Sequence, residues 1–332
     1  MKKVNVAING FGRIGRIALR MMIDHPFIEV KAINDLTDAN TLKHLFKYDS
    51  VHGVYPGEVN IVDSCLCVKE QKIQILKEMD PLQLPWEELE IDLVIESTGA
   101  FVTREGSQKH ITAGAKKVLI SAPAKGNDVK TIVLGVNDEI LRADDTIVSN
   151  ASCTTNCLAP MIKVLQEKVG VEKGYITTIH AYTADQRIQD APHRDLRRAR
   201  SGAVSIIPTT TGAAAAVGKV MPEMDGRLDG MAMRVPIPDG SITDCSLILN
   251  EEVSADQINE WMQEASETWL KGVMEYTEDP IVSIDIVGNK HSCIFDSQLT
   301  KTDGKLVKVV GWYDNEMGYA ARLVDMVNLL FT

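Results

Sequence analysis

The sequence predicts an α/β fold whose N-terminal half contains a parallel sheet, and two patterns support this. Residues 3–9 alternate like a buried strand, and apolar residues then recur at helical spacing. Three later segments are almost continuously apolar, as strands are when helices cover both faces of a sheet: 91–97, 117–121 and 131–135. A chain of 332 residues is long for one core, so two domains are expected.

Three glycines lie between the first predicted strand and helix, in the pattern Gly10-x-Gly12-x-x-Gly15. In this context the first allows a tight turn, the second lets a pyrophosphate approach the backbone, and the third lets helix and strand pack closely. Asp35 ends the next predicted strand, 29–35, where a carboxylate binds the ribose hydroxyls and repels a 2′-phosphate. These residues predict a dinucleotide site that prefers NAD. A glycine-rich turn without a ligand, with Asp35 as a solvated cap, is the alternative.

Composition excludes several classes of protein. A net charge of −11 argues against nucleic acid as the main partner. No apolar segment approaches the length of a membrane span, and Asn5, Asn9 and Arg13 interrupt the N-terminal apolar run that a signal peptide needs. The six cysteines lack the spacing of a zinc site, so we expect no metal, free thiols and a cytoplasmic location.

Cys153 stands among small hydroxylated residues where an apolar strand is expected to turn into a helix. The N–H groups at a helix N-terminus favour a thiolate and lower its pKa. A helix to Lys168 runs about 22 Å away and a strand from 175 to 180 returns about 20 Å, so His180 can arrive beside the thiol as its base. If Pro160 delays the helix to residue 159, His180 activates the thiol alone. A buried structural cysteine is the alternative.

Two further segments predict anion binding. Arg234 lies inside an apolar strand pattern, where an unpaired guanidinium is costly, so it requires an anionic partner. Thr211 and Gly212 open another predicted helix, 213–220, whose hydroxyl and N–H donors face an anion.

Five segments in order resemble the phosphorylating glyceraldehyde-3-phosphate dehydrogenases: 9–16, 149–160, 180–183, 205–212 and 312–316. The resemblance implies a Rossmann-type NAD-binding domain over 1–150, joined by a C-terminal helix at 316–332. It also implies an α+β catalytic domain with a mainly antiparallel sheet over 151–315. The implied reaction is NAD-dependent oxidation of D-glyceraldehyde 3-phosphate with inorganic phosphate to 1,3-bisphosphoglycerate, in a homotetramer.

The resemblance also implies a role for each site residue. Cys153 is the nucleophile and His180 the base. The cofactor residues are Gly10, Gly12, Arg13, Ile14, Gly15, Asp35, Met79, Thr98, Gly99, Ser121, Asn315 and Tyr319. The residues for the substrate's phosphate and for inorganic phosphate are Ser152, Thr154, Thr183, Arg198, Thr211, Gly212 and Arg234. Arg198 belongs to a loop expected to lie against the cofactor of a neighbouring subunit.

The chain departs from the family pattern at three positions. Ala215 stands where lysine is usual, Ala191 where a larger apolar residue is common, and Met79 where arginine is frequent. None of these removes a catalytic group, although Ala191 loosens the expected space around the adenosine ribose. An erythrose-4-phosphate dehydrogenase, which uses water in its last step, is one alternative. A non-catalytic NAD- or RNA-binding regulatory homologue is another.

Overall fold

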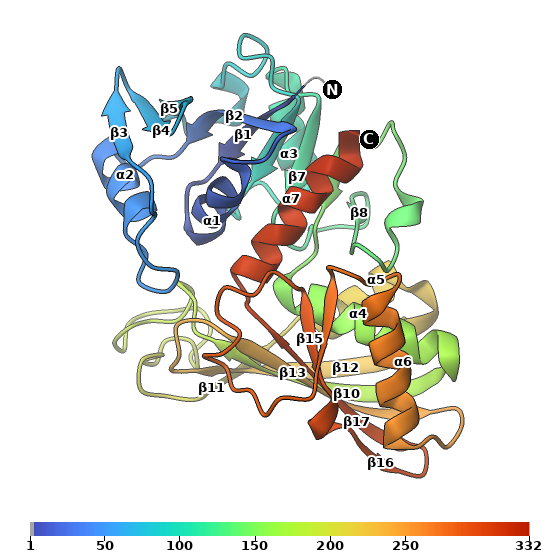
Figure 1. The fold of residues 1–332 in the computed structure, drawn as a ribbon. Helices are drawn as coiled ribbons and strands as arrows, with labels where there is room; N and C mark the ends of the chain where they lie inside the picture. The colour runs from blue at the N-terminus through green and yellow to red at the C-terminus, as the bar shows by residue number, and fades with distance from the viewer. Residues whose placement is uncertain (1–2, 332) are drawn as a thin grey trace. The chain divides into compact units, whose positions relative to one another are not determined.

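The computed structural model describes residues 3–331. The chain forms two compact units. One contains most residues up to Ile132, then Glu139–Ala151 and the chain from Ala320 onward, and the other contains Val133–Asp138 and Ser152–Tyr319. Each unit is built around one sheet (Figure 1). No helix within the described residues combines the length and the apolar character that crossing a bilayer requires.

The first unit contains a nine-stranded sheet in the order β3-β4-β5-β2-β1-β6-β7-β9-β8. All neighbouring strands are parallel except at β3/β4 and β4/β5, which confirms the predicted parallel sheet. The strands are β1 (Val4–Asn9), β2 (Ile28–Asn34), β3 (Val59–Val62), β4 (Cys65–Val68), β5 (Gln71–Leu76), β6 (Leu93–Glu96), β7 (Lys117–Ile120), β8 (Lys130–Thr131) and β9 (Ile147–Ser149). The helices are α1 (Arg13–Met22), α2 (Ala39–Lys47) and α3 (Arg104–Thr112), with short 3₁₀ turns at Pro81–Gln83 and Asp138–Ile140.

The strand order places a topological switch point at β1. The chain goes from β1 through α1 to β2 on one side, and β6 pairs with β1 on the other. In open parallel sheets ligands bind at the carboxyl ends of the strands at such a point. These ends are at Asn9, Asn34 and Glu96.

The strand predicted at 131–135 is wrong for most of its length. Pairing ends at Thr131, and the neighbouring strand is β9, the apolar strand that was expected to lead into the helix at Cys153. The chain turns because the Asn137 side chain accepts a hydrogen bond from Val133 N at 2.8 Å, and Gly135 adopts a φ of 77°. A local side-chain bond therefore replaces the ladder that the apolar residues suggested.

The second unit contains an eight-stranded sheet in the order β11-β12-β10-β13-β17-β15-β14, with β16 also on β17. Only β10/β12 and β14/β15 are parallel, so the predicted mainly antiparallel sheet is confirmed. The strands are β10 (Val171–Ala181), β11 (Ile207–Thr210), β12 (Leu228–Val235), β13 (Ser241–Leu249), β14 (Met274–Thr277), β15 (Cys293–Asp296), β16 (Lys301–Asp303) and β17 (Leu306–Tyr313). The helices are α4 (Cys153–Lys168), α5 (Ala213–Val220) and α6 (Ala255–Glu267), with 3₁₀ turns at Pro222–Met224 and Ser297–Leu299. The last helix, α7 (Met317–Phe331), begins in this unit and belongs to the first unit from Ala320 onward.

One face of this second sheet is covered by helices of the same unit. Helix α4 packs on β10, β13, β15 and β17, with α5 and α6 beside it. Along β13 buried residues alternate with partly exposed ones, as expected for a sheet whose helices cover one face. On the strands, Tyr175 and Leu306 remain exposed.

Candidate active site

Cys153 is the first residue of helix α4. Ala151 has a φ of 56°, which turns the chain sharply after β9. Ser152 then caps the helix, because its Oγ accepts a hydrogen bond from Thr155 N at 3.1 Å. Pro160 lies inside the helix without ending it, so the alternative start at residue 159 is wrong. The thiol therefore lies in the first turn, where unpaired N–H groups favour negative charge.

His180 is the penultimate residue of β10, and its Nε2 lies 3.4 Å from the Cys153 Sγ. The predicted return of the strand to the helix start is thus confirmed. His180 Nδ1 lies 2.7 Å from Ala181 O. In the tautomer with the ring proton on Nδ1, that proton is donated to Ala181 O, and the unprotonated Nε2 faces the sulfur. The pair can therefore act as nucleophile and proton acceptor.

Burial controls the protonation of both groups. Burial and, to a smaller extent, the Arg234 guanidinium lower the pKa of His180 to about 3, so the ring is neutral at neutral pH. Burial also raises the pKa of the Cys153 thiol, although the residue as a whole is partly exposed. Arg234 and Thr154 act in the opposite direction. The sequence predicts a lowered thiol pKa, but desolvation outweighs these contributions, so the thiol requires a nearby proton acceptor.

Arg234 is the register partner of His180 on strand β12. Its Nη1 lies 2.8 Å from His180 Nδ1 and donates to Ala181 O at 2.9 Å. Its Nε is buried without a hydrogen-bond partner, and no carboxylate forms an ion pair with Arg234 in residues 3–331. The required anionic partner is therefore not supplied by the described chain, and a bound anion would remove the cost of this buried cation.

A chain of hydroxyl groups lies beside the catalytic pair. Tyr313 OH is 2.8 Å from Thr154 Oγ1 and 2.8 Å from Thr178 Oγ1, and the Tyr313 ring meets the His180 ring edge-on. Burial raises the pKa of the Tyr313 phenol, which stays neutral. Sequence reasoning missed Tyr313, although it stands next to Asp314 in a segment that had been recognised. The Thr154 hydroxyl forms one end of this network.

The other predicted anion ligands lie on three segments. Thr211 Oγ1 accepts from Ala213 N at 3.2 Å, and Gly212 is the N-cap of α5. Thr183 N and Oγ1 both donate to Gln186 Oε1. Arg198 is held within its own loop, where its guanidinium pairs with Asp185 and donates to Thr209 Oγ1 at 2.7 Å.

A pocket of about 410 Å³ opens at the carboxyl ends of β1, β2 and β6. It is lined by five predicted cofactor residues, Gly10, Gly12, Asp35, Met79 and Thr98. Asp35 accepts hydrogen bonds from Phe11 N at 2.8 Å and Thr37 N at 2.9 Å, which fixes its carboxylate. A Cβ on Gly10 would lie 2.6 Å from Thr98 N, whereas the space beside Gly12 is open. The pocket thus fits a dinucleotide whose pyrophosphate approaches the backbone at Gly12.

Five of the predicted cofactor residues in the first unit do not line this pocket: Arg13, Ile14, Gly15, Gly99 and Ser121. Gly15 is required for packing, since its Cβ would lie 2.4 Å from Gly10 O. Arg13 forms an ion pair with Asp49 at 2.6 Å. Sequence reasoning missed the other lining residues, Asn9, Asn34, Leu36, Glu78, Ser97, Ala100 and Phe101. A usable signal was present, because β1, β2 and β6 each end in a polar residue.

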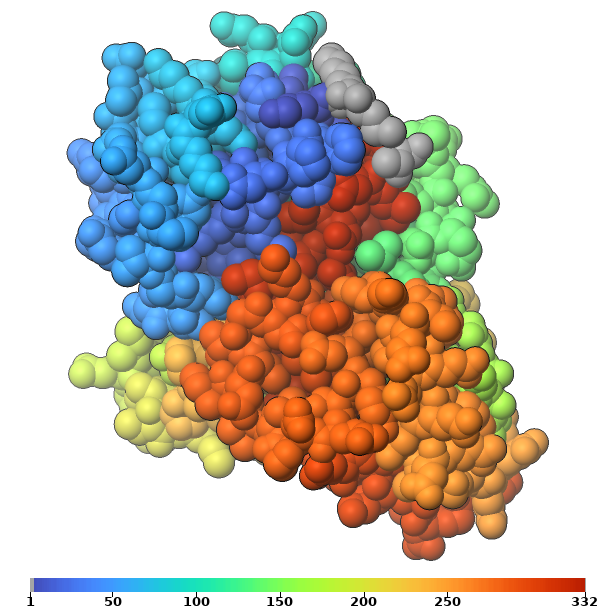
Figure 2. Space-filling model, viewed as in Figure 1, coloured from blue at the N-terminus to red at the C-terminus, as the bar shows by residue number. Residues whose placement is uncertain are grey.

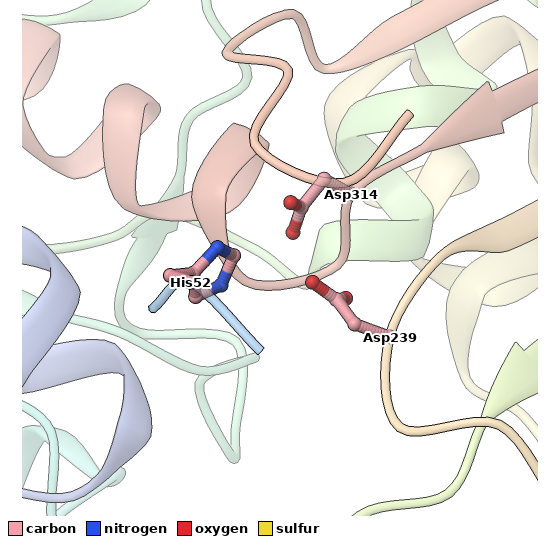
Figure 3. Close-up of side chains that lie close together, drawn as sticks. All are labelled: His52, Asp239 and Asp314. Atoms are coloured by element: carbon pink, nitrogen blue, oxygen red, sulfur yellow. The ribbon is translucent and has the colours of Figure 1, made fainter. Parts of the chain in front are cut away.

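Asn315 and Tyr319 lie at the start of α7 in the second unit, and both are buried. Asn315 Oδ1 accepts from Ser241 Oγ at 2.6 Å, which orients its amide. Asp314 caps the helix by accepting from Glu316 N and Met317 N at 2.8 and 2.7 Å. Figure 3 shows its carboxyl group close to that of Asp239. Burial and the nearby Asp314 carboxylate raise the pKa of Asp239 to about 9, so Asp239 keeps its proton at neutral pH.

This proton makes stability depend on pH. Between its unfolded pKa of about 4 and the folded value of about 9, the folded chain binds a proton that the unfolded chain lacks, so stability falls as pH rises, by on the order of 1 kcal/mol per pH unit. Asp239→Asn removes this contribution. We expect thermal unfolding, followed by circular dichroism, to show a shallower loss of Tm between about pH 6 and 9 than in the wild type. Parallel curves of Tm against pH for the two proteins would contradict the raised pKa of Asp239.

Comparison with known proteins agrees with this geometry. A model described as "Glyceraldehyde 3-phosphate dehydrogenase, NAD binding domain" matches residues 4–104, and one described as the C-terminal domain of the same enzyme matches residues 152–315. The chain is 55% identical to glyceraldehyde-3-phosphate dehydrogenase of Clostridium pasteurianum over 325 residues, 96% of each chain. It is 56% identical to that of Thermotoga maritima over 328 residues, 98% of each, and 52% identical to glyceraldehyde-3-phosphate dehydrogenase 1 of Bacillus subtilis over 325 residues, 97% of each. The chain therefore belongs to the glyceraldehyde-3-phosphate dehydrogenase family, as the resemblance of its sequence motifs indicates.

Proposed function

We propose that this protein oxidises D-glyceraldehyde 3-phosphate with NAD⁺ and inorganic phosphate to 1,3-bisphosphoglycerate. The observation that carries the proposal is the 3.4 Å contact between Cys153 Sγ, at the start of α4, and His180 Nε2. Full-length similarity to curated glyceraldehyde-3-phosphate dehydrogenases supports it.

The catalytic pair performs the covalent chemistry. Cys153 transfers its proton to His180 Nε2, its sulfur adds to the aldehyde carbon, and the aldehyde oxygen takes up that proton, which forms a thiohemiacetal. His180 Nε2 then accepts the hydroxyl proton. When bound, NAD⁺ would supply the nicotinamide ring that accepts the hydride lost from the thiohemiacetal carbon. The resulting thioester at Cys153 is attacked by phosphate, so the C–S bond breaks, the thiolate is regenerated and the acyl phosphate leaves. Backbone N–H groups at the start of α4 and the His180 side chain stabilise the oxyanions.

Two groups of residues bind the phosphates in this proposal. Arg234 and Thr183 hold the substrate's phosphate, and Arg198 raises the local concentration of anions. Ser152, Thr154, Thr211 and Gly212 hold the attacking phosphate. The buried Nε of Arg234 without a partner supports the first group, and the start of α5, where the N-cap Gly212 makes no side-chain cap bond, supports the second.

Gly10, Gly12, Asp35, Met79 and Thr98 form the adenosine side of the NAD site in the first domain, which we define as residues 1–150 with the returning helix 316–332. Around them we place Arg13, Ile14, Gly15, Gly99 and Ser121. Asn315 and Tyr319 hold the nicotinamide amide and belong to the proposal on the resemblance alone. The pocket at the ends of β1, β2 and β6 supports the adenosine part.

Cofactor preference is expected to depend on Asp35. Its carboxylate is fixed by Phe11 N and Thr37 N, so a 2′-phosphate would meet a charge that cannot move away. We expect the wild type to prefer NAD⁺ over NADP⁺, and Asp35→Ala to reduce the ratio of the two kcat/KM values at least about tenfold, equivalent to about 1.4 kcal/mol. Asp38→Ala, which removes a helix-capping carboxylate outside the pocket, is the control. Equal wild-type efficiency with both cofactors would refute the role of Asp35.

The proposed reaction is tested by following NADH formation from glyceraldehyde 3-phosphate with and without phosphate. Continued turnover should require phosphate, and arsenate should replace it. Thr211→Ala should raise the phosphate requirement while the single-turnover burst of NADH remains, because one lost bond to a charged group costs about 1.5–3 kcal/mol at that step only. Thr210→Ala, one position earlier on β11, serves as the control. Phosphate-independent turnover would instead indicate hydrolysis of the thioester.

We further propose that the protein acts as a homotetramer in the cytoplasm. The segment 182–206 supports assembly, because four of its apolar side chains are 65–82% exposed: Ile188, Leu196, Val204 and Ile206. Figure 2 shows part of this segment, in yellow-green, at the surface. Six free cysteines suit a reducing compartment. Sedimentation at micromolar concentration is expected to give four chains, and a monomeric mass would rule out this assembly.

A further inference from the structure

A row of polar residues crosses the sheet directly behind the cofactor pocket. Strands β2, β1 and β6 end in Asn34, Asn9 and Glu96, and these three residues are register partners across the parallel strands. All three are buried, and so are His110, which contacts Glu96, and Trp86, which contacts His110; both are 0% exposed. Buried polar groups are costly unless each finds its partner, so the hydrogen-bond polarity of this row can be worked out group by group.

At one end of the row the polarity is set by a peptide backbone. Glu78 N donates to Asn34 Oδ1 at 2.8 Å, and Asn34 Nδ2 donates to Glu78 O at 2.8 Å. A backbone N–H and C=O cannot exchange roles, so the Asn34 amide has one orientation. Its Nδ2 also donates to Asn9 Oδ1 at 2.7 Å. The Asn9 amide nitrogen must therefore point at Glu96, where it donates to Oε2 at 2.6 Å.

At the other end the polarity is set by an indole. Trp86 Nε1 is a donor only, and it donates to His110 Nδ1 at 3.0 Å. His110 Nδ1 is then unprotonated and the ring proton is on Nε2, which lies 3.0 Å from Glu96 Oε2 and donates to it. The His110 ring is therefore neutral and has one tautomer.

Glu96 receives donors at both oxygens. Asn9 and His110 donate to Oε2, and the Thr98 N–H donates to Oε1 at 2.9 Å together with the Thr98 hydroxyl. Asn9 Nδ2, the Trp86-fixed His110 Nε2 and the Thr98 N–H can only donate here, and the Thr98 hydroxyl completes the set. Glu96 is thus the hydrogen-bond acceptor at the centre of this network.

This carboxylate joins the parts of the cofactor pocket. Asn9, Asn34, Glu78 and Thr98 all line the pocket, and the Gly10 turn lies so close to Thr98 N that no Cβ fits between them. We propose that Glu96 is a positioning residue for NAD, which holds Thr98 and Asn9 in place against the glycine turn, with Trp86 and His110 fixing the polarity. This inference rests on the proposed cofactor site.

Glu96→Gln is the direct test, because it preserves shape and exchanges one acceptor oxygen for a donor. Neither orientation of the amide fits: its nitrogen would face Thr98 N in one and Asn9 Nδ2 and His110 Nε2 in the other. We expect the Kd for NAD⁺, measured by calorimetry, to rise at least about tenfold. The KM for glyceraldehyde 3-phosphate and the rate of Cys153 alkylation should stay within about twofold of the wild type. Gln108→Glu, on the exposed side of α3, is a control for altered charge.

A second substitution distinguishes positioning from general destabilisation. Trp86→Phe removes the donor at His110 Nδ1, so the ring can take the other tautomer and accept at Nε2 from the new amide. Trp86→Phe should weaken NAD⁺ binding slightly on its own, yet recover at least about threefold of the affinity lost in Glu96→Gln. A general packing defect would instead make the double variant weaker than either single variant, which would overturn the inference.

One measurement needs no folded variant. In wild-type protein labelled with ¹⁵N at histidine, His110 should show an unprotonated Nδ1 and a protonated Nε2, and the opposite tautomer would overturn the inference. Unchanged NAD⁺ affinity in Glu96→Gln would also overturn it while leaving the proposed function intact. A wild type that does not bind NAD⁺ would remove the proposed function itself.

Discussion

Replacing Cys153 with serine is expected to abolish NADH formation, while NAD⁺ binding stays close to that of the wild type. A serine hydroxyl has no comparable anionic fraction at neutral pH, so it cannot add to the aldehyde carbon even with His180 Nε2 in contact. The residues of the pocket at β1, β2 and β6 are unchanged by this substitution. The measurements are a spectrophotometric assay of NADH and a calorimetric titration with NAD⁺.

Cys157→Ser is the matched control, since this thiol lies one helical turn away on α4 and is fully buried. Its Sγ faces Gly311 O at 3.6 Å, so it has a structural environment away from His180. Cys157→Ser should form NADH at close to the wild-type rate and lose only some stability. Substantial NADH formation by Cys153→Ser, or its loss in Cys157→Ser alone, would move the nucleophile to another residue.

The parts of the fold that were predictable depend on local pattern and backbone geometry. The glycine motif identified the turn between β1 and α1, because only glycine tolerates the contacts of 2.6 Å at residue 10 and 2.4 Å at residue 15. The position of Asp35 followed from strand length. The limits of α5 were predicted correctly as well. The contact between the start of α4 and the end of β10 at the catalytic pair could also be predicted, since the rise per residue of helices and of strands is nearly constant.

What could not be predicted depends on contacts between distant segments. The Asn34, Asn9 and Glu96 row exists only once β2, β1 and β6 are in register, and Trp86 and His110 complete it from outside those strands. Tyr313 reaches Thr154 across 159 residues. The raised thiol pKa of Cys153 also escaped prediction, because desolvation depends on the whole surrounding packing and not on its helix alone.

Replacing His180 with asparagine is expected to lower kcat by about 10²–10⁴-fold, the range typical of a lost acid or base. Asparagine keeps a polar side chain at the end of β10 but cannot take up a proton. Burial raises the thiol pKa, so Cys153 needs His180 as the acceptor within contact. A proton that reaches His180 leaves a thiolate beside it, and the two opposite charges stabilise each other, although the ring is neutral beside a protonated thiol.

The deciding measurement is the rate of Cys153 alkylation by iodoacetamide as a function of pH, taken beside kcat. In His180→Asn the alkylation rate should fall at neutral pH and rise again only at higher pH, because the thiol then loses its proton to solvent. His193→Asn is the control, since this histidine contacts Asp185 within the 182–206 segment and not the thiol. If alkylation in His180→Asn kept the wild-type pH profile while kcat fell, the helix terminus would activate Cys153, and His180 would act only as the base for the thiohemiacetal hydroxyl.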